Sequence, residues 1–286
     1  MNIGVIGLGL IGGSFALAAK EHITDVVLFG RDKRVSNIKE AIKKGIIDYE
    51  LKSKDFTKMD ILILAIPVDA ATDIVRNLLD KINDNALLFD VGSTKYSICK
   101  MVELHPKRNQ FLGTHPIAGT EFSGPLAAFS DLYVNKTQIL CETEKTRPDL
   151  LEWAIQFFHS IDMNIQEMDP KEHDQHIAYV SHISHISSFM LGKTVMEKED
   201  NEKAIFDMAG SGFASTVRLA KSSPEMWTPI FKQNNENILE VLNEYIANLE
   251  QFKSLLENKD WSEMHIQIKD INSIKKILKG IPESKT

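Results

Sequence analysis

Residues 2–12 read Asn2-Ile3-Gly4-Val5-Ile6-Gly7-Leu8-Gly9-Leu10-Ile11-Gly12. An apolar run typical of a buried strand leads into a Gly-x-Gly-x-x-Gly turn, and residues 14–20 have the apolar spacing of a helix. Gly7 allows the tight turn, Gly9 lets the backbone approach an anion, and Gly12 lets the helix pack on the strand. The helix N-terminus adds N–H groups and a positive dipole end. The stretch predicts a strand, turn and helix whose residues 7–12 bind the pyrophosphate of a dinucleotide.

The residues beyond the turn bear on which dinucleotide binds. Asp32 ends the next predicted strand, 20 residues after Gly12, where a carboxylate can bind the hydroxyls of the adenine ribose. Arg31 lies beside it, and a basic group at this position can accommodate the 2'-phosphate of NADP. We expect NAD, with NADP as the alternative. Ile66 and Pro67 end a further strand at the same edge, where they either pack against the cofactor or only turn the chain.

The first half of the chain alternates between short runs rich in Val, Ile and Leu and segments of helical period. Such alternation is typical of a doubly wound α/β domain, a parallel sheet with helices on both faces. We therefore predict an N-terminal Rossmann domain over residues 1–168. The expected strands are residues 3–7, 26–29, 61–66, 87–91, 110–113, 138–141 and 164–167, and the expected helices include residues 14–20, 36–44, 70–80 and 148–159.

After residue 168 the strand signals stop. Asp169 before Pro170 has the form of a helix N-cap followed by proline in the first turn. Residues 169–286 are predicted to form an all-helical dimerisation domain, because long amphipathic helices can bury their apolar stripes against a second copy. We expect a homodimer through it. The expected helices are residues 171–197, 202–221, 224–256 with a break, and 261–278.

The composition excludes several classes of protein. A chain of 286 residues with 43% hydrophobic and 26% charged residues is globular and long enough for two domains. The formal net charge of −7 argues against a nucleic-acid partner, and the two cysteines argue against a disulfide scaffold. Neither a signal peptide nor an apolar run long enough to cross a bilayer is evident, so we expect no membrane partner and a cytoplasmic location.

Two other predicted strands end in polar residues that can carry chemistry. They continue as Asp90-Val91-Gly92-Ser93-Thr94-Lys95 and as Gly113-Thr114-His115-Pro116-Ile117-Ala118-Gly119-Thr120-Glu121. Ligands of open α/β sheets bind at the carboxyl ends of the strands. His115 suits general acid–base catalysis, and Ser93 could orient both its imidazole and a substrate alcohol. Thr120 and Glu121 either touch the substrate or cap the turn.

The sequence resembles the prephenate/arogenate dehydrogenase family, which makes tyrosine precursors, over nearly the whole chain. The resemblance rests on the glycine turn, the two strand-end motifs, Val180-Ser181-His182-Ile183-Ser184-His185 and Ala214-Ser215-Thr216-Val217-Arg218-Leu219-Ala220. It implies NAD-dependent oxidative decarboxylation of prephenate to 4-hydroxyphenylpyruvate by a Rossmann domain with a helical dimerisation domain. His115 is then the catalytic histidine that bonds the ring hydroxyl, with Ser93 its hydrogen-bonding companion. Arg218 and His185 anchor the carboxylate side chain of the substrate.

The predicted helix from residue 171 carries four histidines. His173 and His176 stand in a polar stretch, so we expect them to be solvated or to face a dimer partner. His182 is either a supporting partner in the active site or an ordinary packing residue. No metal site is predicted, because no HExxH pattern or cysteine cluster completes a ligand set. Trp227 has helical spacing with its apolar neighbours and is expected in the core.

Three alternative functions remain open on the sequence. One alternative is an arogenate dehydrogenase with NADP as cofactor, although the scarcity of acids near His185 favours prephenate. A β-hydroxyacid dehydrogenase shares the glycine turn, but Gly192-Lys193 matches its lysine motif only faintly and the His-Pro-x-Ala-Gly motif is left unexplained. A non-catalytic NAD-sensing module would not need Ser93, His115 and Arg218. An activity assay separates these possibilities.

Overall fold

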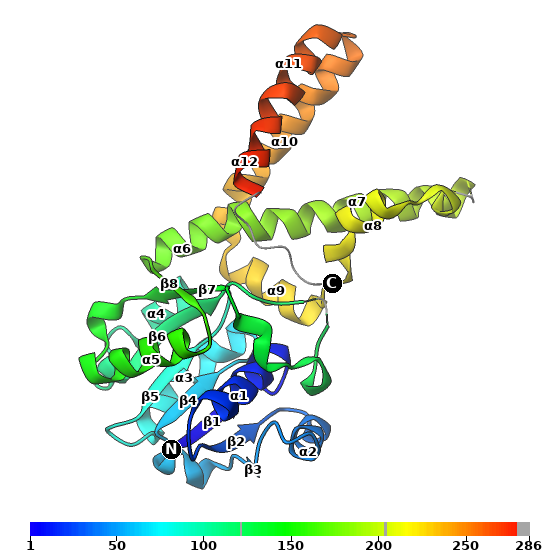
Figure 1. Ribbon diagram of the computed structural model, residues 1–286. Helices are drawn as coiled ribbons and strands as arrows, with labels where there is room; N and C mark the ends of the chain where they lie inside the picture. Colours follow the sequence, from blue (N-terminus) through cyan, green and yellow to red (C-terminus); the bar gives the residue numbers. More distant parts are fainter. Residues whose placement is uncertain (121, 203–204, 279–286) are drawn as a thin grey trace. The chain divides into compact units, whose positions relative to one another are not determined.

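The computed structural model describes residues 1–120, 122–202 and 205–278 (Figure 1). Its centre is one eight-stranded sheet of order β3-β2-β1-β4-β5-β6-β7-β8, in which only β7 runs antiparallel to its neighbour β6. The predicted doubly wound α/β fold is confirmed. The strands are β1 (Asn2–Ile6), β2 (Val27–Arg31), β3 (Tyr49–Glu50), β4 (Ile61–Leu64), β5 (Leu87–Asp90), β6 (Phe111–Pro116), β7 (Thr137–Cys141) and β8 (Asn164–Glu167).

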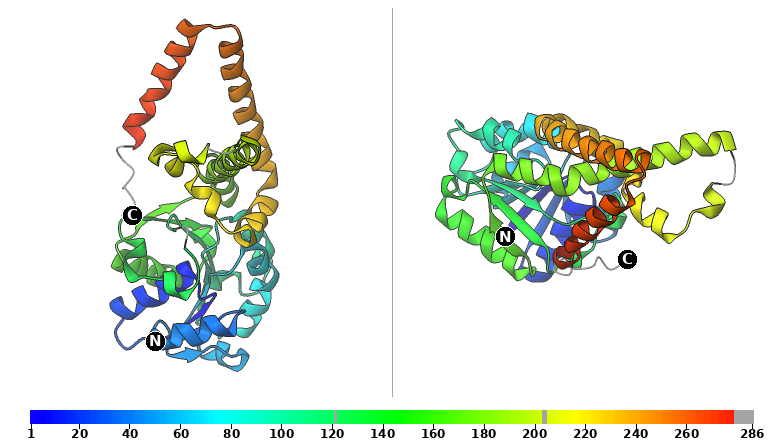
Figure 2. Two further views of the ribbon diagram at one scale, coloured as in Figure 1. Left: turned by 90° about the vertical axis from the view of Figure 1, so that its right-hand side faces the viewer. Right: turned by 90° about the horizontal axis from the view of Figure 1, so that it is seen from above.

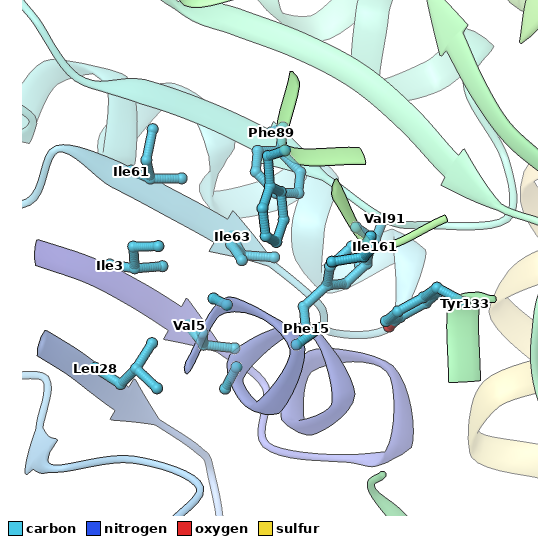
Figure 3. Close-up of a cluster of buried hydrophobic side chains, with 14 of the residues drawn as sticks. Ile3, Val5, Phe15, Leu28, Ile61, Ile63, Phe89, Val91, Tyr133 and Ile161 are labelled. Atoms are coloured by element: carbon cyan, nitrogen blue, oxygen red, sulfur yellow. The ribbon is translucent and has the colours of Figure 1, made fainter. Parts of the chain in front are cut away.

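Helices cover both faces of the sheet because strand side chains alternate between two hydrophobic cores. In β4, Ile61 and Ile63 belong to one core, and Leu62 and Leu64 to the other. Residues of α1 (Leu10–His22), α2 (Val35–Lys43) and α5 (Pro148–Ser160) fill the first core, and residues of α3 (Val68–Lys81) and α4 (Tyr96–Val102) fill the second. Figure 3 shows the first core, where Phe15 stacks on Tyr133 at 4.1 Å between ring centroids.

Three features of the sheet domain differ from the sequence prediction. The strand β3 was not expected, and it pairs through only two residues at the edge of the sheet. The helix α4 was also not expected. The sheet is also not parallel throughout, because β7 pairs antiparallel with β6, with Gly113 opposite Cys141 and His115 opposite Ile139. A parallel return needs a crossover, usually helical. The described part of the β6–β7 connection contains only the 3₁₀ turns Pro125–Ala127 and Ser130–Tyr133.

Residues after β8 are helical, as predicted. Asp169 accepts hydrogen bonds from the backbone N–H groups of Lys171 and Glu172, which confirms the expected N-cap. Helix α6 (Pro170–Ile177) passes through a π-helical turn (Ala178–His182) into α7 (Ile183–Glu202), and Figures 1 and 2 show the three as one continuous rod.

The prediction of one helix over residues 202–221 is wrong. In the described part of that segment the chain forms only α8 (Ser211–Thr216) and two 3₁₀ turns, Phe206–Met208 and Arg218–Lys221. Gly210 and Gly212 favour a helix less than other residues do, which helps to explain the interruption. The expected break within residues 224–256 is confirmed and falls at Asn234, between α9 (Pro224–Gln233) and α10 (Asn235–Glu257).

The chain divides into two compact units, Met1–Asn235 and Glu236–Thr286. The first contains the sheet and the helices through α9. The described part of the second contains most of α10, α11 (Trp261–Ile271) and α12 (Lys275–Leu278), and Asp260 caps the N-terminus of α11 by accepting from the backbone N–H of Glu263. None of the helices in the described ranges is both long and apolar enough to cross a membrane.

Candidate active site

The glycine turn between β1 and α1 leaves room for a ligand at only one of its three glycines. Gly7 has φ of +99°, and a Cβ there would lie 2.0 Å from the carbonyl oxygen of Ala65. A Cβ on Gly12 would lie 2.0 Å from the carbonyl oxygen of Gly7. At Gly9 a Cβ would meet no protein atom within 4 Å. The open space over Gly9, in front of the N-terminus of α1, therefore fits a dinucleotide pyrophosphate.

The other residues of the turn direct their side chains or backbone groups into the protein interior. Leu8 and Leu10 are buried in the core, so their side chains point away from the open space. The backbone carbonyl of Ile11 accepts a hydrogen bond of 2.6 Å from the hydroxyl of Tyr133. These contacts hold the start of α1 against the hydrophobic core and the 3₁₀ turn Ser130–Tyr133.

Asp32 links the end of β2 to the same turn. Its Oδ2 accepts a 2.9 Å hydrogen bond from the backbone N–H of Leu8, and its Oδ1 accepts one of 2.8 Å from that of Arg34. The carboxylate is thus held at the position expected for a ribose-binding acid. Arg31 beside it is exposed and donates to Ser53 Oγ at 3.3 Å.

Ile66 and Pro67 lie on the opposite side of the turn, between β4 and α3. A Cβ on Gly7 would come within 2.9 Å of Ile66 Cγ2, so Ile66 borders the turn directly. Pro67 is exposed and stands immediately before α3, whose first residue is Val68. Both residues therefore lie at the edge of the sheet that carries the glycine turn.

His115 ends β6 at the carboxyl edge of the sheet and is joined to a buried pair of side chains. Its Nδ1 lies 2.9 Å from Nε2 of His173, and Nδ1 of His173 lies 2.8 Å from Oδ1 of Asp174. Both partners belong to α6. Asp174 also accepts from the backbone N–H groups of Lys95 at 2.7 Å and Tyr96 at 2.9 Å. The first helix after the sheet domain is therefore bonded to both strand-end motifs.

A buried ion pair between Lys95 and Asp90 lies in the same region, and neither side chain is exposed beyond 1%. Burial raises the pKa of Asp90, which the neighbouring Lys95 opposes. The pKa of His115 is held well below 6.5, first by burial and then by the nearby His173 and Lys95. His115 is consequently a neutral imidazole at physiological pH and can accept a proton.

A second group of aromatic and basic side chains lies on α7 and α9. The ring of His185 stacks on Trp227 at 3.5 Å between centroids, and its Nδ1 lies 3.0 Å from the carbonyl oxygen of Ser181. Burial and then the positive charge of Arg218 lower the pKa of His185. Trp227 is buried, which confirms its predicted place in a core.

His182 occupies the π-helical turn that precedes α7. Its Nδ1 lies 3.1 Å from Nδ2 of Asn234, and the side chain is wholly buried. Burial lowers its pKa to about 4. Such π-helical turns are often found at functional sites. His182 is also one of the groups that lower the pKa of His115.

The remaining predicted site residues have less defined surroundings. Ser93 is half-buried in the β5–α4 connection, and within the described ranges no hydrogen bond joins it to His115. Thr120 is exposed, and its hydroxyl accepts from the backbone N–H of Phe122 at 3.3 Å. Glu121 lies outside the described residues. Arg218 is exposed and starts the 3₁₀ turn Arg218–Lys221.

The sequence interpretation missed His173 and Asp174. We expected His173 to be solvated or dimer-facing, and that prediction is wrong, because it is 2% exposed and bonded to His115. The buried residues of α6 are Pro170, His173, Asp174 and Ile177, a spacing of i, i+3, i+4 and i+7 that marks the inner face of a helix. That spacing was visible in the sequence, whereas His176 is exposed as expected.

No group of three or more His, Cys, Asp or Glu side chains is arranged to hold a metal ion in the part of the chain that the structure covers. The titratable cluster around His115 is instead joined by hydrogen bonds between its own members.

Comparisons with known proteins cover both halves of the chain. Residues 15–167 match the nucleotide-binding domain of prephenate dehydrogenase, and residues 169–270 match its dimerization domain. The prephenate dehydrogenase of Bacillus subtilis is 32% identical over 258 residues, which cover 89% of this chain and 70% of that protein.

Two crystal structures resemble the fold closely. One is the prephenate dehydrogenase from A. aeolicus in complex with hydroxyphenyl propionate and NAD⁺, at 29% identity and a TM-score of 0.89, covering 97% of this chain and 98% of the other. The second is the arogenate dehydrogenase from Synechocystis, at 28% identity and a TM-score of 0.79, covering 97% of this chain and all of the other. These similar proteins differ in the substrate that they are named for.

Proposed function

The chain belongs to the prephenate dehydrogenase family and is an oxidoreductase, and from this premise we propose that it converts prephenate to 4-hydroxyphenylpyruvate with NAD, in tyrosine biosynthesis. The observation that carries the proposal is the buried imidazole of His115 at the carboxyl edge of the sheet. Its lowered pKa keeps it neutral and able to take a proton. The glycine turn lies at the same edge, because β6 runs parallel to β5, β4 and β1.

The residues of this site suit the chemistry of the substrate. Prephenate is a cyclohexadienol that carries two carboxylates. His115 accepts the proton of the ring hydroxyl, which helps hydride to leave the carbinol carbon. NAD, when bound, supplies the acceptor for that hydride. Loss of the ring carboxylate as carbon dioxide then leaves an aromatic phenol, and Ser93 assists by orienting the hydroxyl.

We assign cofactor binding to the glycine turn and the strand ends around it. The backbone of residues 7–12 binds the pyrophosphate, since only Gly9 has open space in front of it. Asp32 binds the adenine ribose and favours NAD, while Arg31 is the residue through which NADP could be accommodated. Ile66 and Pro67 pack against the cofactor.

Arg218, His185 and Thr120 are assigned to the substrate. A guanidinium can hold a carboxylate through two parallel hydrogen bonds, which fixes the reacting ring in place. Prephenate carries a ketone beside its side-chain carboxylate, where arogenate carries an ammonium group. The positive charge of Arg218 acts on His185. A cation in this position repels an ammonium group, and this favours prephenate.

We also propose that the chain works as a homodimer, with the domain boundary at residue 168. The part of the chain that matches the family's dimerization domain begins at residue 169. In the second compact unit, the helix α10 exposes Ile246, Leu249, Phe252 and Leu256, whose spacing forms one apolar stripe. Such a stripe is typical of a helix that packs against a partner.

The test is absorbance at the reduced-nicotinamide band with purified full-length protein. Prephenate and arogenate are each offered with NAD and with NADP. We expect the fastest turnover with prephenate and NAD. Turnover confined to arogenate would contradict the role of Arg218 in substrate choice, and turnover confined to NADP would contradict that of Asp32. Folded protein that binds NAD and is inactive in all four mixtures would overturn the proposed reaction and favour the sensing module.

A further inference from the structure

The carboxylate of Asp174 has three hydrogen-bond partners, and two of them are backbone N–H groups. The side chain of Asp174 is buried, and its two oxygens accept from the backbone N–H groups of Lys95 and Tyr96. Backbone N–H groups can only donate, so these contacts require oxygen lone pairs on the carboxylate. The third contact, of 2.8 Å, is with Nδ1 of His173. That nitrogen must therefore carry a proton and donate it.

The protonation of His115 follows from that of His173. A neutral histidine that donates from Nδ1 has a bare Nε2, which can only accept. Nε2 of His173 lies 2.9 Å from Nδ1 of His115, so this Nδ1 is the donor. The bare nitrogen of His115 is then Nε2. We propose that His173 and Asp174 are positioning residues that hold His115 in the tautomer with Nδ1 protonated, so that Nε2 is free to accept the proton of the substrate hydroxyl.

The positioning pair is itself fixed from several directions. The carbonyl oxygen of Asp174 accepts a 2.6 Å hydrogen bond from Nδ2 of Asn234, and its carboxylate is held at the N-terminus of α4. The rings of His115 and His173 meet edge to face, with centroids 5.1 Å apart and planes at 74°. A histidine ring bonded on one side and packed on the other has little freedom to flip. The direction of Nε2 is thus determined before substrate binds.

The charges around His115 explain why a carboxylate is needed behind it. Lys95, His173 and His182 each disfavour a positive charge on His115, and Asp90 is paired with Lys95. When Nε2 of His115 takes a proton, its Nδ1–H still donates to His173, whose own Nδ1–H is held by Asp174. The carboxylate stabilises positive charge on either ring through this connection. Asp174 therefore assists proton uptake without touching the substrate.

This inference rests on the proposed function for its purpose, but its first test needs no substrate. The full-length protein is labelled with ¹⁵N-histidine, and long-range ¹H–¹⁵N spectra are recorded near neutral pH. His115 and His173 are assigned by comparison with the variants His115→Asn and His173→Gln. We expect both residues to show a protonated Nδ1 and an unprotonated Nε2. A protonated Nε2 on His115 in the wild-type protein would overturn the proposal, whatever the enzyme's substrate is.

The second test compares replacements of His173 in the activity assay. His173→Gln can place an amide oxygen near the position of Nε2 and so retains an acceptor for His115, whereas His173→Phe has none. We expect His173→Phe to lower kcat about 10- to 100-fold with KM changed less than about threefold, and His173→Gln to recover most of the loss. His176→Phe, on the exposed face of the same helix, is the matched control. Equal losses in folded Phe and Gln variants would contradict the positioning role.

The pH profile distinguishes positioning from packing. His173 lowers the pKa of His115, and both replacements of His173 remove that effect. Only His173→Gln keeps an acceptor for Nδ1–H of His115, and a hydrogen bond to the charged form of His115 raises its pKa. We therefore expect the acidic limb of kcat/KM to lie at lower pH in His173→Phe than in His173→Gln. Limbs at the same pH in the two folded variants would mean that His173 only fills space. If His173→Phe does not fold, the tautomer of His115 in the wild-type protein decides the question.

Discussion

At the scale of single residues, burial decides the chemistry of the histidines. His115, His182 and His185 all have a lowered pKa with burial as the first cause, whereas His176 on the outer face of α6 is exposed. A histidine in water is half protonated near pH 6.5 and would be a poor base below that pH. Burial keeps the imidazole of His115 neutral down to a lower pH, and the contact with His173 fixes the orientation of its ring.

Replacing His115 tests its role as the base. We expect His115→Asn to lower kcat by about 10² to 10⁴, the usual contribution of general acid–base catalysis, with little change in KM. The measurement is steady-state reduction of NAD with prephenate. His176→Asn serves as the control and should retain wild-type kcat. Unchanged turnover in His115→Asn would remove this residue from the mechanism.

Replacing Arg218 tests the anchor of the substrate. We expect Arg218→Ala to raise KM for prephenate roughly tenfold to a hundredfold, since charge-assisted hydrogen bonds to a carboxylate are lost. KM for NAD should stay near its wild-type value. Lys221→Ala removes a cation from the same 3₁₀ turn and should leave both constants unchanged. If both variants raise KM for prephenate equally, the cations of this turn attract the substrate only through their charge, and Arg218 is not a specific anchor.

At the scale of elements, the three glycines of the turn between β1 and α1 have different structural roles. Gly7 and Gly12 are required by the protein's own backbone, because a Cβ on either would lie 2.0 Å from a carbonyl oxygen. A Cβ on Gly9 would meet no protein atom within 4 Å, so packing within the protein does not require glycine there. The sequence pattern treats the three glycines as one motif, but only Gly9 has open space in front of it.

Alanine at two of these glycines separates binding from stability. We expect Gly12→Ala to lower the melting temperature by several degrees, because β1 and α1 must move apart. Gly9→Ala should melt like the wild-type protein and yet bind NAD at least about tenfold more weakly, since its Cβ enters the pyrophosphate space. Calorimetric titration and thermal unfolding measure the two effects. Tight NAD binding by Gly9→Ala would contradict the assigned cofactor site.

At the scale of the whole molecule, the buried histidines make stability depend on pH. The pKa of His182 is about 4 in the folded protein and returns to about 6.5 on unfolding, so the unfolded chain binds protons more strongly between these values. The contribution of neutral His182 to the free energy of unfolding is fully present above pH 6.5 and is lost as the pH falls toward 4. We expect the free energy of unfolding in urea to be on the order of 2 kcal/mol lower at about pH 5 than near neutrality from this residue alone.

A variant identifies the source of this pH dependence. In His182→Phe the free energy of unfolding should change less between neutrality and about pH 5 than it does in the wild-type protein. His176→Phe, which removes an exposed histidine, should keep the wild-type dependence. Greater stability at acidic pH in the wild-type protein would show that the buried histidines are not held neutral.

Self-association is the second property of the whole molecule. We expect sedimentation to give about twice the mass of the chain, because the stripe on α10 is covered by a partner. Phe252→Asp places a charge within that stripe and should shift the protein toward monomer, whereas Gln251→Asp, which places the same charge on the opposite face of α10, should not. A Phe252→Asp protein that remains dimeric at low concentration would place the interface elsewhere.

Local patterns in the sequence determined the fold class, because they depend only on near neighbours along the chain. The glycine turn, the alternation of apolar runs with helical segments and the Asp169 cap each follow from spacing within one or two elements. Membership of the family was visible in the same way, from motifs in order. The interruption of residues 202–221 was missed because two glycines weaken a helix without specifying what replaces it.

Only the tertiary structure decided which side chains meet. His115 and His173 are 58 residues apart and contact each other because α6 crosses the carboxyl edge of the sheet. Polar residues such as His173 and Asp174 resemble a solvated helix face until a partner is seen to cover them. The direction of β7 likewise depends on the path of a connection that carries little periodic signal. Long-range pairing is set by how elements pack, and no local spacing encodes it.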